Sequence, residues 1–220
     1  MSTVTIIGGH GKVALLAAPL LTDRGHRVRS VVRDPARVGD VEATGAEAVV
    51  LDVEQADIDA LTDLLRDSDV VVWSAGAGGG SPERTYAVDR DAAIRSMEAA
   101  EAAGADRYVM VSYFGAGPAH GVPEDDAFFP YADAKATADT HLRGTSLAWT
   151  ILGPSRLTLA EPTGRIAVGG SRASSSEVSR ANVAEVIAQV VDRGDLVRRT
   201  VEFDDGDTPV GEALDAAADS

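Results

Sequence analysis

A glycine-rich segment near the N-terminus has the spacing of a phosphate-binding turn. It consists of Gly8, Gly9, His10, Gly11, Lys12, Val13 and Ala14, in which Gly8, Gly11 and Ala14 follow a GxxGxxA pattern. Small residues at these positions permit a tight turn, a close approach of backbone N–H groups to a pyrophosphate, and close packing of the following helix. The N-terminus of that helix adds partial positive charge. We therefore expect residues 8–13 to bind a dinucleotide, and a plain glycine-rich turn is the alternative.

The residues after the second expected strand bear on which dinucleotide is bound. In NAD-selective sites an acidic residue holds the ribose 2′-hydroxyl, whereas a 2′-phosphate prefers arginine. Arg33 occupies this position and Arg37 follows one helical turn later, which favours NADP over NAD. Asp34 is the counter-argument, because a shift of one residue would present its carboxylate instead. In a third interpretation these are ordinary loop charges.

Further contacts to the same ligand are expected after the third and fourth strands. Asp52 and Val53 are placed to border the adenine, with Asp52 as an acceptor for its amino group. Ala75 and Gly76 leave room for the ribose and the nicotinamide. In the glycine-rich segment, Lys12 either contacts a phosphate or is solvated, and His10 offers its backbone rather than acting as a catalyst.

Ser112, Tyr131 and Lys135 form the third group of candidate residues. Tyr131 and Lys135 are the ends of a YxxxK pentad within an expected helix, so both side chains lie on one face. A phenol of pKa about 10 is a poor acid–base group at neutral pH, and a nearby ammonium lowers that pKa by favouring the phenolate. Ser112 closes the fifth expected strand, where its hydroxyl can hold a carbonyl or alcohol. We expect these three to be catalytic; the alternative is a surface Tyr–Lys pair.

Strands and helices that can position these groups alternate along the chain. Short apolar or β-branched runs predict strands at 3–7, 28–32, 48–51, 69–73, 108–111, 147–152 and 200–203, and helical periodicity predicts helices at 11–24, 58–65, 83–103, 130–143 and 183–191. Such alternation gives βαβ units with right-handed crossovers. The predicted fold class is α/β, a doubly wound parallel sheet (Rossmann fold) in a single domain over 1–220. Residues 153–220 are expected to form a small C-terminal annex on the substrate side.

Three stretches are low in complexity: the glycine-rich loop over residues 76–81, the serine-rich run over 171–176 and the acidic, alanine-rich tail. The first interrupts the connection after the fourth strand, at the ligand-binding edge of such sheets. It either closes over a ligand or is a flexible surface turn.

Composition narrows the function further. The 220 residues carry 20 Lys and Arg against 35 Asp and Glu, a net charge of −15. This argues against nucleic-acid binding, because phosphate backbones require a positive face. The absence of cysteine excludes a disulfide framework, a thiolate nucleophile and a Cys-ligated metal, and we expect no metal site. No apolar run approaches the ~20 residues of a membrane span, and no signal-peptide pattern opens the chain. We expect a cytoplasmic protein without membrane association.

The order of the motifs resembles that of a known family. Segments 8–14, 88–93, 104–112 and 131–135 together look like the atypical short-chain dehydrogenase/reductases, above all the small NAD(P)-binding proteins labelled NAD-dependent epimerase/dehydratase-like or NmrA-like. The similarity spans about residues 3–203. It implies a Rossmann domain with NAD(P) along the C-terminal edge of the sheet. It also implies Tyr131 as proton donor or acceptor beside Ser112, with Lys135 also near the nicotinamide ribose.

Two features depart from that pattern. Asp89 stands in the stretch where extended members usually carry an asparagine, and the chain lacks their larger C-terminal substrate domain. Arg156, in the turn after the sixth strand, either meets an anionic substrate or pairs with a nearby carboxylate.

The leading hypothesis is an NADP-dependent oxidoreductase that acts on a small carbonyl or alcohol, with NAD as the alternative cofactor. Two other functions use the same parts: a nucleotide-sugar-type epimerase or dehydratase that works through a transient ketone, and a non-catalytic redox sensor that binds NADP(H) and signals to a partner. Flavin reduction is neither supported nor excluded. The motifs specify neither the substrate nor the oligomeric state.

Overall fold

The computed structural model describes residues 1–79, 81–169 and 176–219. The main strands are β1 (Thr3–Ile7), β2 (Arg27–Val32), β3 (Glu47–Val50), β4 (Val70–Trp73), β5 (Arg107–Val111), β6 (Ala148–Pro154) and β10 (Arg199–Asp205). The helices are α1 (Lys12–Asp23), α2 (Val38–Glu42), α3 (Ile58–Leu65), α4 (Pro82–Thr85), α5 (Ala93–Ala103), α6 (Phe129–Gly144), α7 (Arg180–Val190) and α8 (Val210–Ala218), with short helical turns η1 (Pro35–Arg37), η2 (Tyr86–Ala92) and η3 (Gly194–Leu196). Smaller strands are β7 (Arg156–Thr158), β8 (Arg165–Val168), β9 (Glu177–Ser179) and β11 (Thr208–Pro209).

The central sheet has the strand order β11-β8-β10-β6-β5-β4-β1-β2-β3. The strands from β3 to β10 in this order are parallel, and β8 and β11 are antiparallel additions at one edge. The order 3-2-1-4-5-6 places the chain reversal between β1 and β4, where open α/β sheets bind their ligands. The predicted doubly wound fold is confirmed. Beyond β6, the chain also forms β8, β11 and α8 and the two-stranded sheet β7–β9.

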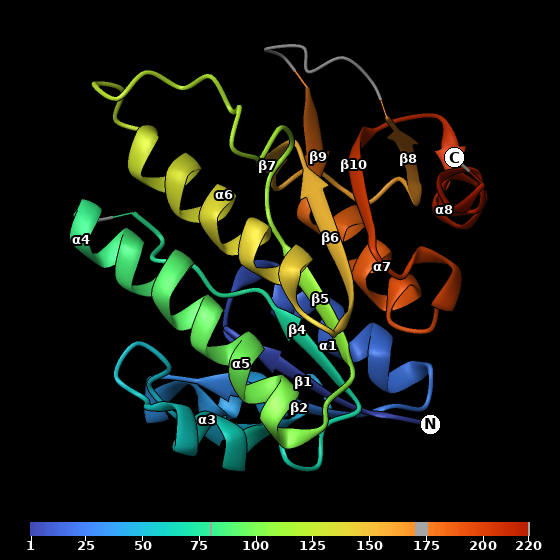
Figure 1. Cartoon of the computed structure of the whole chain (residues 1–220). Helices are drawn as coiled ribbons and strands as arrows, with labels where there is room; N and C mark the ends of the chain where they lie inside the picture. Colours follow the sequence, from blue (N-terminus) through green and yellow to red (C-terminus); the bar gives the residue numbers. More distant parts are fainter. Residues whose placement is uncertain (80, 170–175, 220) are drawn as a thin grey trace.

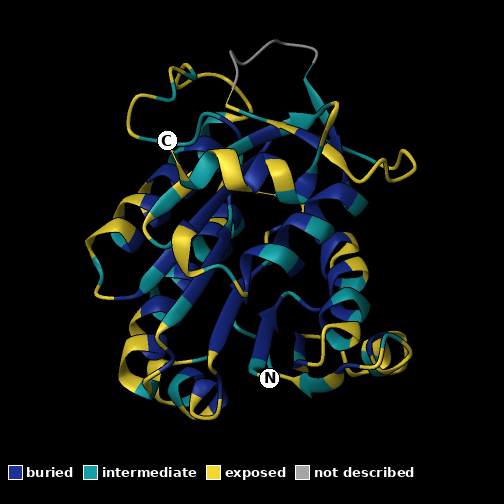
Figure 2. Cartoon of the chain, turned by 90° about the vertical axis from the view of Figure 1, so that its right-hand side faces the viewer, coloured by how far each residue is buried: buried dark blue, intermediate teal, exposed yellow. Residues whose placement is uncertain are grey.

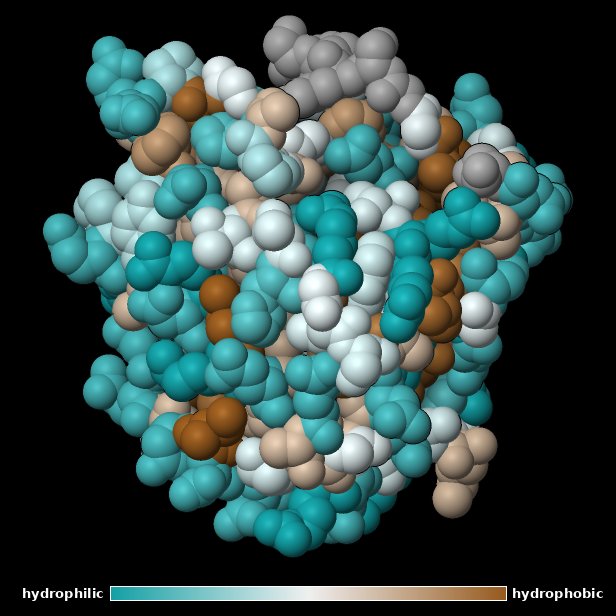
Figure 3. All heavy atoms as spheres, viewed as in Figure 1, coloured by the Kyte–Doolittle hydropathy of each residue, from teal (hydrophilic) through white to brown (hydrophobic). Residues whose placement is uncertain are grey.

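Helices cover both faces of the sheet (Figure 1). One buried cluster joins α1, α7 and α8 to the sheet, and the other joins α3, α5 and α6 to the opposite face. The inner strands β1, β4, β5 and β6 are mostly buried (Figure 2), as expected for parallel strands covered on both sides. The outer face of α4, α5 and α6 is mostly hydrophilic (Figure 3), which suits the strongly acidic composition.

The predicted helix over 83–103 differs most from expectation, because it is divided. Residues Tyr86–Ala92 form a π-helical turn between α4 and α5. This wider turn buries the Asp89 carboxylate, which accepts a hydrogen bond of 2.9 Å from Ala77 N. The π-helical turn therefore brings the Asp89 carboxylate from a helix to the edge of the sheet. Such π turns are often found at functional sites.

Two of the low-complexity stretches can be placed. The acidic tail forms α8, whose Val210, Ala213 and Leu214 are buried against α7 and β8 at i, i+3 and i+4 spacing. Most of the serine-rich run, over 170–175, lies outside the described residues, as does residue 80 in the glycine-rich loop. Within the described part of the chain, no helix is both long and apolar enough to cross a bilayer.

Candidate functional site

The glycine-rich turn lies between the ends of β2 and β4, because β1 pairs with both strands. Gly8 has a φ of +88°, and a Cβ there would lie 2.6 Å from the backbone of Ala75. A Cβ on Gly9 would lie 2.6 Å from Ser30 Cβ. Both glycines are therefore required for close packing.

The same turn ends at the N-terminus of α1. Gly11 is the N-cap residue, no side chain caps the helix, and its first turn contains no acidic residue. Gly11, Lys12 and Val13 line a cavity at this point, with Lys12 exposed. An uncapped helix start facing a cavity suits an anionic group such as a pyrophosphate.

Three adjoining cavities run along the C-terminal edge of the sheet. The loop cavity, of about 360 Å³, and the central cavity, of about 1010 Å³, share Gly11, Ser74, Ala75 and Gly76 as wall residues. The central cavity and the aromatic cavity, of about 650 Å³, share Ser112, Phe128, Tyr131 and Leu157. The crevice therefore continues from the glycine turn to Tyr131.

The loop cavity contains most of the residues expected to hold the adenosine end. Gly8, His10, Arg33, Asp52 and Val53 line it, and His10 Nε2 lies 2.9 Å from Asp40 Oδ2. Gly9 and Asp34 are outside its described lining. Asp34 instead accepts a hydrogen bond from Ala36 N at 2.9 Å and caps η1.

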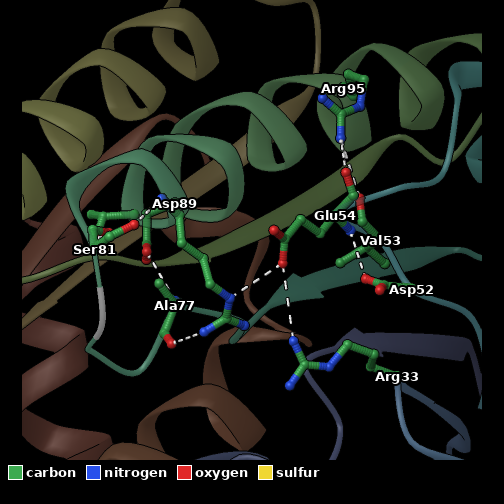
Figure 4. Close-up of polar contacts among 10 residues, drawn as sticks. Arg33, Asp52, Val53, Glu54, Ala77, Ser81, Asp89 and Arg95 are labelled. Carbon is green, nitrogen blue, oxygen red and sulfur yellow. Dashed lines mark hydrogen bonds and ion pairs between the residues drawn. The ribbon is translucent and has the colours of Figure 1, made fainter.

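Glu54 and Arg84 are the residues that sequence reasoning missed in this cavity. Glu54 Oε2 lies 4.0 Å from Arg33 Nη1 and 3.4 Å from Arg84 Nε (Figure 4). Arg84 Nη1 also donates to Ala77 O at 2.6 Å, and Arg95 donates to Glu54 O at 3.1 Å. The cavity therefore offers two guanidinium groups that share one carboxylate. No local sequence motif predicts this pairing, because Glu54 and Arg84 lie thirty residues apart.

Behind the central cavity, Lys135 is buried in a group of charged side chains. Its side chain is 1% exposed, and Nζ donates to Val111 O at 2.8 Å. Asp139, one turn further along α6, accepts a hydrogen bond of 2.6 Å from Ser112 Oγ. The positive charge of Lys135 lowers the pKa of Asp89 and of Asp139, although burial outweighs it and raises both. Asp139 could have been found by extending the YxxxK spacing another four residues.

The structure brings Ser112 and Tyr131 to the wall of one cavity, but Lys135 does not lie on that wall in the described lining. The predicted lowering of the Tyr131 pKa by Lys135 is wrong. Burial raises the pKa of the Tyr131 hydroxyl, and the charges of Asp89 and Asp139 raise it further. Tyr131 is therefore a neutral phenol at physiological pH. Lys135 donates to the Val111 carbonyl and to the Met110 sulfur, and it acts on the buried carboxylates of Asp89 and Asp139 through its charge.

Arg156 pairs with a nearby carboxylate, which is the second of the two alternatives that the sequence left open. It lines the aromatic cavity and forms an ion pair with Glu177. Its charge is thus matched by a carboxylate of the neighbouring strand β9.

These features fit an adenine dinucleotide. Gly8 and Gly9 pack so closely against Ala75 and Ser30 that no side chain fits there. The uncapped start of α1 borders the central cavity, and Arg33 and Arg84 line the loop cavity. Fold and site together define a Rossmann-type dinucleotide-binding protein.

Comparison with known proteins identifies the family. The NAD(P)H-binding family model matches residues 8–193, and the chain belongs to this family. It is 33% identical to a UPF0659 protein of Schizosaccharomyces pombe, covering 97% of this chain and 94% of that protein. It is 32% identical to a Bacillus subtilis protein named as an uncharacterized sugar epimerase, covering 96% and 98%. A solved Bacillus halodurans structure, whose name proposes an NAD-dependent epimerase/dehydratase, is 30% identical with a TM-score of 0.90, covering 98% and 100%.

Proposed function

We propose that the chain is an NADP-preferring oxidoreductase that reduces a small carbonyl compound to an alcohol. The observation that supports this most strongly is the single cavity lined by the glycine turn, by Ala75 and Gly76, and by Ser112 and Tyr131. These residues would hold a dinucleotide between the glycine turn and Tyr131, on one continuous wall.

The chain's own contribution is to hold and protonate the substrate oxygen. When bound, the reduced dinucleotide supplies a hydride to the carbonyl carbon and is itself oxidised. The C–O π pair then moves to oxygen, and Tyr131 gives that oxygen its phenolic proton and later recovers one from solvent. Because its pKa is raised, Tyr131 begins as the acid, which favours the direction of reduction.

Ser112 and Lys135 support this proton transfer in different ways. Ser112 lies on the cavity wall with its hydroxyl proton donated to Asp139, so its oxygen is free to accept a hydrogen bond from the product alcohol. Lys135 holds the end of β5 through the Val111 carbonyl. Arg33 and Arg84 are the groups that would hold a ribose 2′-phosphate in place of Glu54.

A Tyr131→Phe variant tests the proposal against the sensor and epimerase alternatives. With wild-type protein, a panel of ketones and aldehydes should oxidise NADPH, measured by its nicotinamide absorbance. Tyr131→Phe should lower kcat at least about a hundredfold and leave the NADPH dissociation constant within about twofold. Tyr86→Phe, outside the lining of these cavities, is the matched control. Unchanged turnover in Tyr131→Phe, or no turnover with any carbonyl in wild type, would contradict the proposal.

A further inference from the structure

We infer that the aromatic cavity is the substrate subsite and that it takes a neutral, planar aromatic carbonyl compound rather than a nucleotide sugar. This inference rests on the proposed function, because the carbonyl must reach Tyr131, which both cavities share. It adds the chemical class of the substrate.

Three aromatic rings lie together in the lining of the aromatic cavity, and two of them, Phe128 and Tyr131, also line the central cavity. The Tyr131 ring centroid lies 5.6 Å from that of Tyr113 and 5.2 Å from that of Phe128. Tyr113 and Phe128 meet edge to face at 5.4 Å and 85°. Rings in these orientations present both faces and edges to a flat guest, the arrangement that aromatic pairs prefer.

Phe128 is 39% exposed although it lies in this cluster. It is the residue just before α6 and stands at the junction of the central and aromatic cavities. A large apolar side chain left partly in water gains stability when a ligand covers it, at ~25 cal/mol per Å² of apolar surface. Pro154 and Leu157 add further apolar surface to the lining of the aromatic cavity.

The polar groups of the cavity do not suit a sugar. Among the described residues, no Asp, Glu, Asn or Gln lines it, and these are the side chains that pair with several hydroxyls at once. Its described polar side chains are mainly hydroxyls: Ser112 already donates to Asp139, Arg156 is paired with Glu177, and the buried Ser155 hydroxyl has no hydrogen-bond partner that the structure describes. A ligand with many hydroxyls would find few partners on this wall, whereas an aromatic carbonyl needs a partner only at its oxygen.

The size of the cavity also suits this class. Small-molecule sites occupy about 300–1,000 Å³, and the aromatic cavity measures about 650 Å³. A fused two- or three-ring carbonyl therefore fits with its oxygen at Tyr131 and its rings toward Leu157.

The test compares two probes by calorimetry, 9,10-phenanthrenequinone and UDP-glucose, each with and without saturating NADP⁺. The oxidised dinucleotide cannot reduce the quinone, so the heats report binding alone. Wild type, Phe128→Ala and Phe128→Tyr are compared, with Leu159→Ala as the control, because Leu159 is 74% exposed and outside the described cavity linings. Circular dichroism checks that each variant is folded.

We expect the quinone to bind wild type and Phe128→Tyr equally, and Leu159→Ala likewise, whereas Phe128→Ala weakens binding about tenfold. UDP-glucose should give no heat. Binding of UDP-glucose in competition with the quinone, or quinone binding that is unaffected by Phe128→Ala, overturns the inference. If NADP⁺ fails to bind but the quinone binds with this dependence on Phe128, the proposed function is wrong. The inference that the aromatic cavity binds planar aromatic carbonyl compounds still holds in that case.

Discussion

Replacing Lys135 with methionine tests the role that the structure gives to the buried charged group. Methionine has a similar volume but removes the ammonium whose charge acts on Asp89 and Asp139. The two carboxylates keep their neutral partners, Ala77 N and Ser112 Oγ, but lose their cation. Leaving a buried charge without a compensating charge costs ~3–5 kcal/mol, a large share of the ~5–15 kcal/mol that stabilises a typical domain.

The assay is urea denaturation of the variant and of wild type at pH 7 and pH 5. Without Lys135, the pKa of each buried carboxyl rises further above its unfolded value of ~3.9, because the charge that lowers it is gone. The folded chain then binds protons at a higher pH than the unfolded chain. The stability of the variant is therefore recovered as pH falls toward 5 and lost as pH rises through the folded pKa. The deficit should be largest at pH 7.

Two comparisons make this prediction specific. Lys12, the only other lysine in the sequence, is exposed, so Lys12→Met should leave the free energy of unfolding within ~0.5 kcal/mol. Adding Asp89→Asn and Asp139→Asn to Lys135→Met should restore most of the loss, since no buried charge then remains unpaired. A Lys135→Met variant as stable as wild type at pH 7, or one whose deficit grows on acidification, would refute the reasoning.

Three further predictions follow from the site. Gly8→Ala should abolish dinucleotide binding in calorimetry, because its Cβ would lie 2.6 Å from the Ala75 backbone, whereas Gly25→Ala, at a similar φ of +85° with nothing within 4 Å, should lose only stability. Arg33→Ala should raise the NADP dissociation constant about tenfold and leave that of NAD unchanged. Arg37→Ala, which removes an equal charge outside the loop cavity, should change neither dissociation constant. Equal losses of affinity for both dinucleotides in Arg33→Ala would contradict the assignment of Arg33 to the 2′-phosphate. Asp139→Asn should move the alkaline limb of the pH profile for carbonyl reduction to lower pH, because removing a negative charge lowers the raised pKa of Tyr131; a limb that stays in place would exclude this coupling.

The sheet and its main helices follow from local patterns in the sequence. Runs such as residues 70–73 are apolar and β-branched because both faces of the strand are covered, and the glycine turn is recognisable because its spacing follows a strand and opens a helix. The tail over 210–218 was harder to predict, since its many alanines and acids conceal the few buried positions of α8.

The charges of the site could not be predicted in the same way. The pentad correctly placed Tyr131 and Lys135 on one helix, but the effect of Lys135 depends on Asp89, which reaches the interior only through a π turn. Glu54 and Arg84 meet through tertiary folding alone. A local motif specifies which residues can react, whereas burial and distant charges decide their protonation.

The central claim is that an adenine dinucleotide binds across the glycine turn with its reactive end at Tyr131. Isothermal titration calorimetry of the purified chain with NADPH and NADH tests it most directly. The account predicts one dinucleotide per chain, with NADPH bound at least about tenfold more tightly than NADH. The absence of heat with both dinucleotides would contradict it.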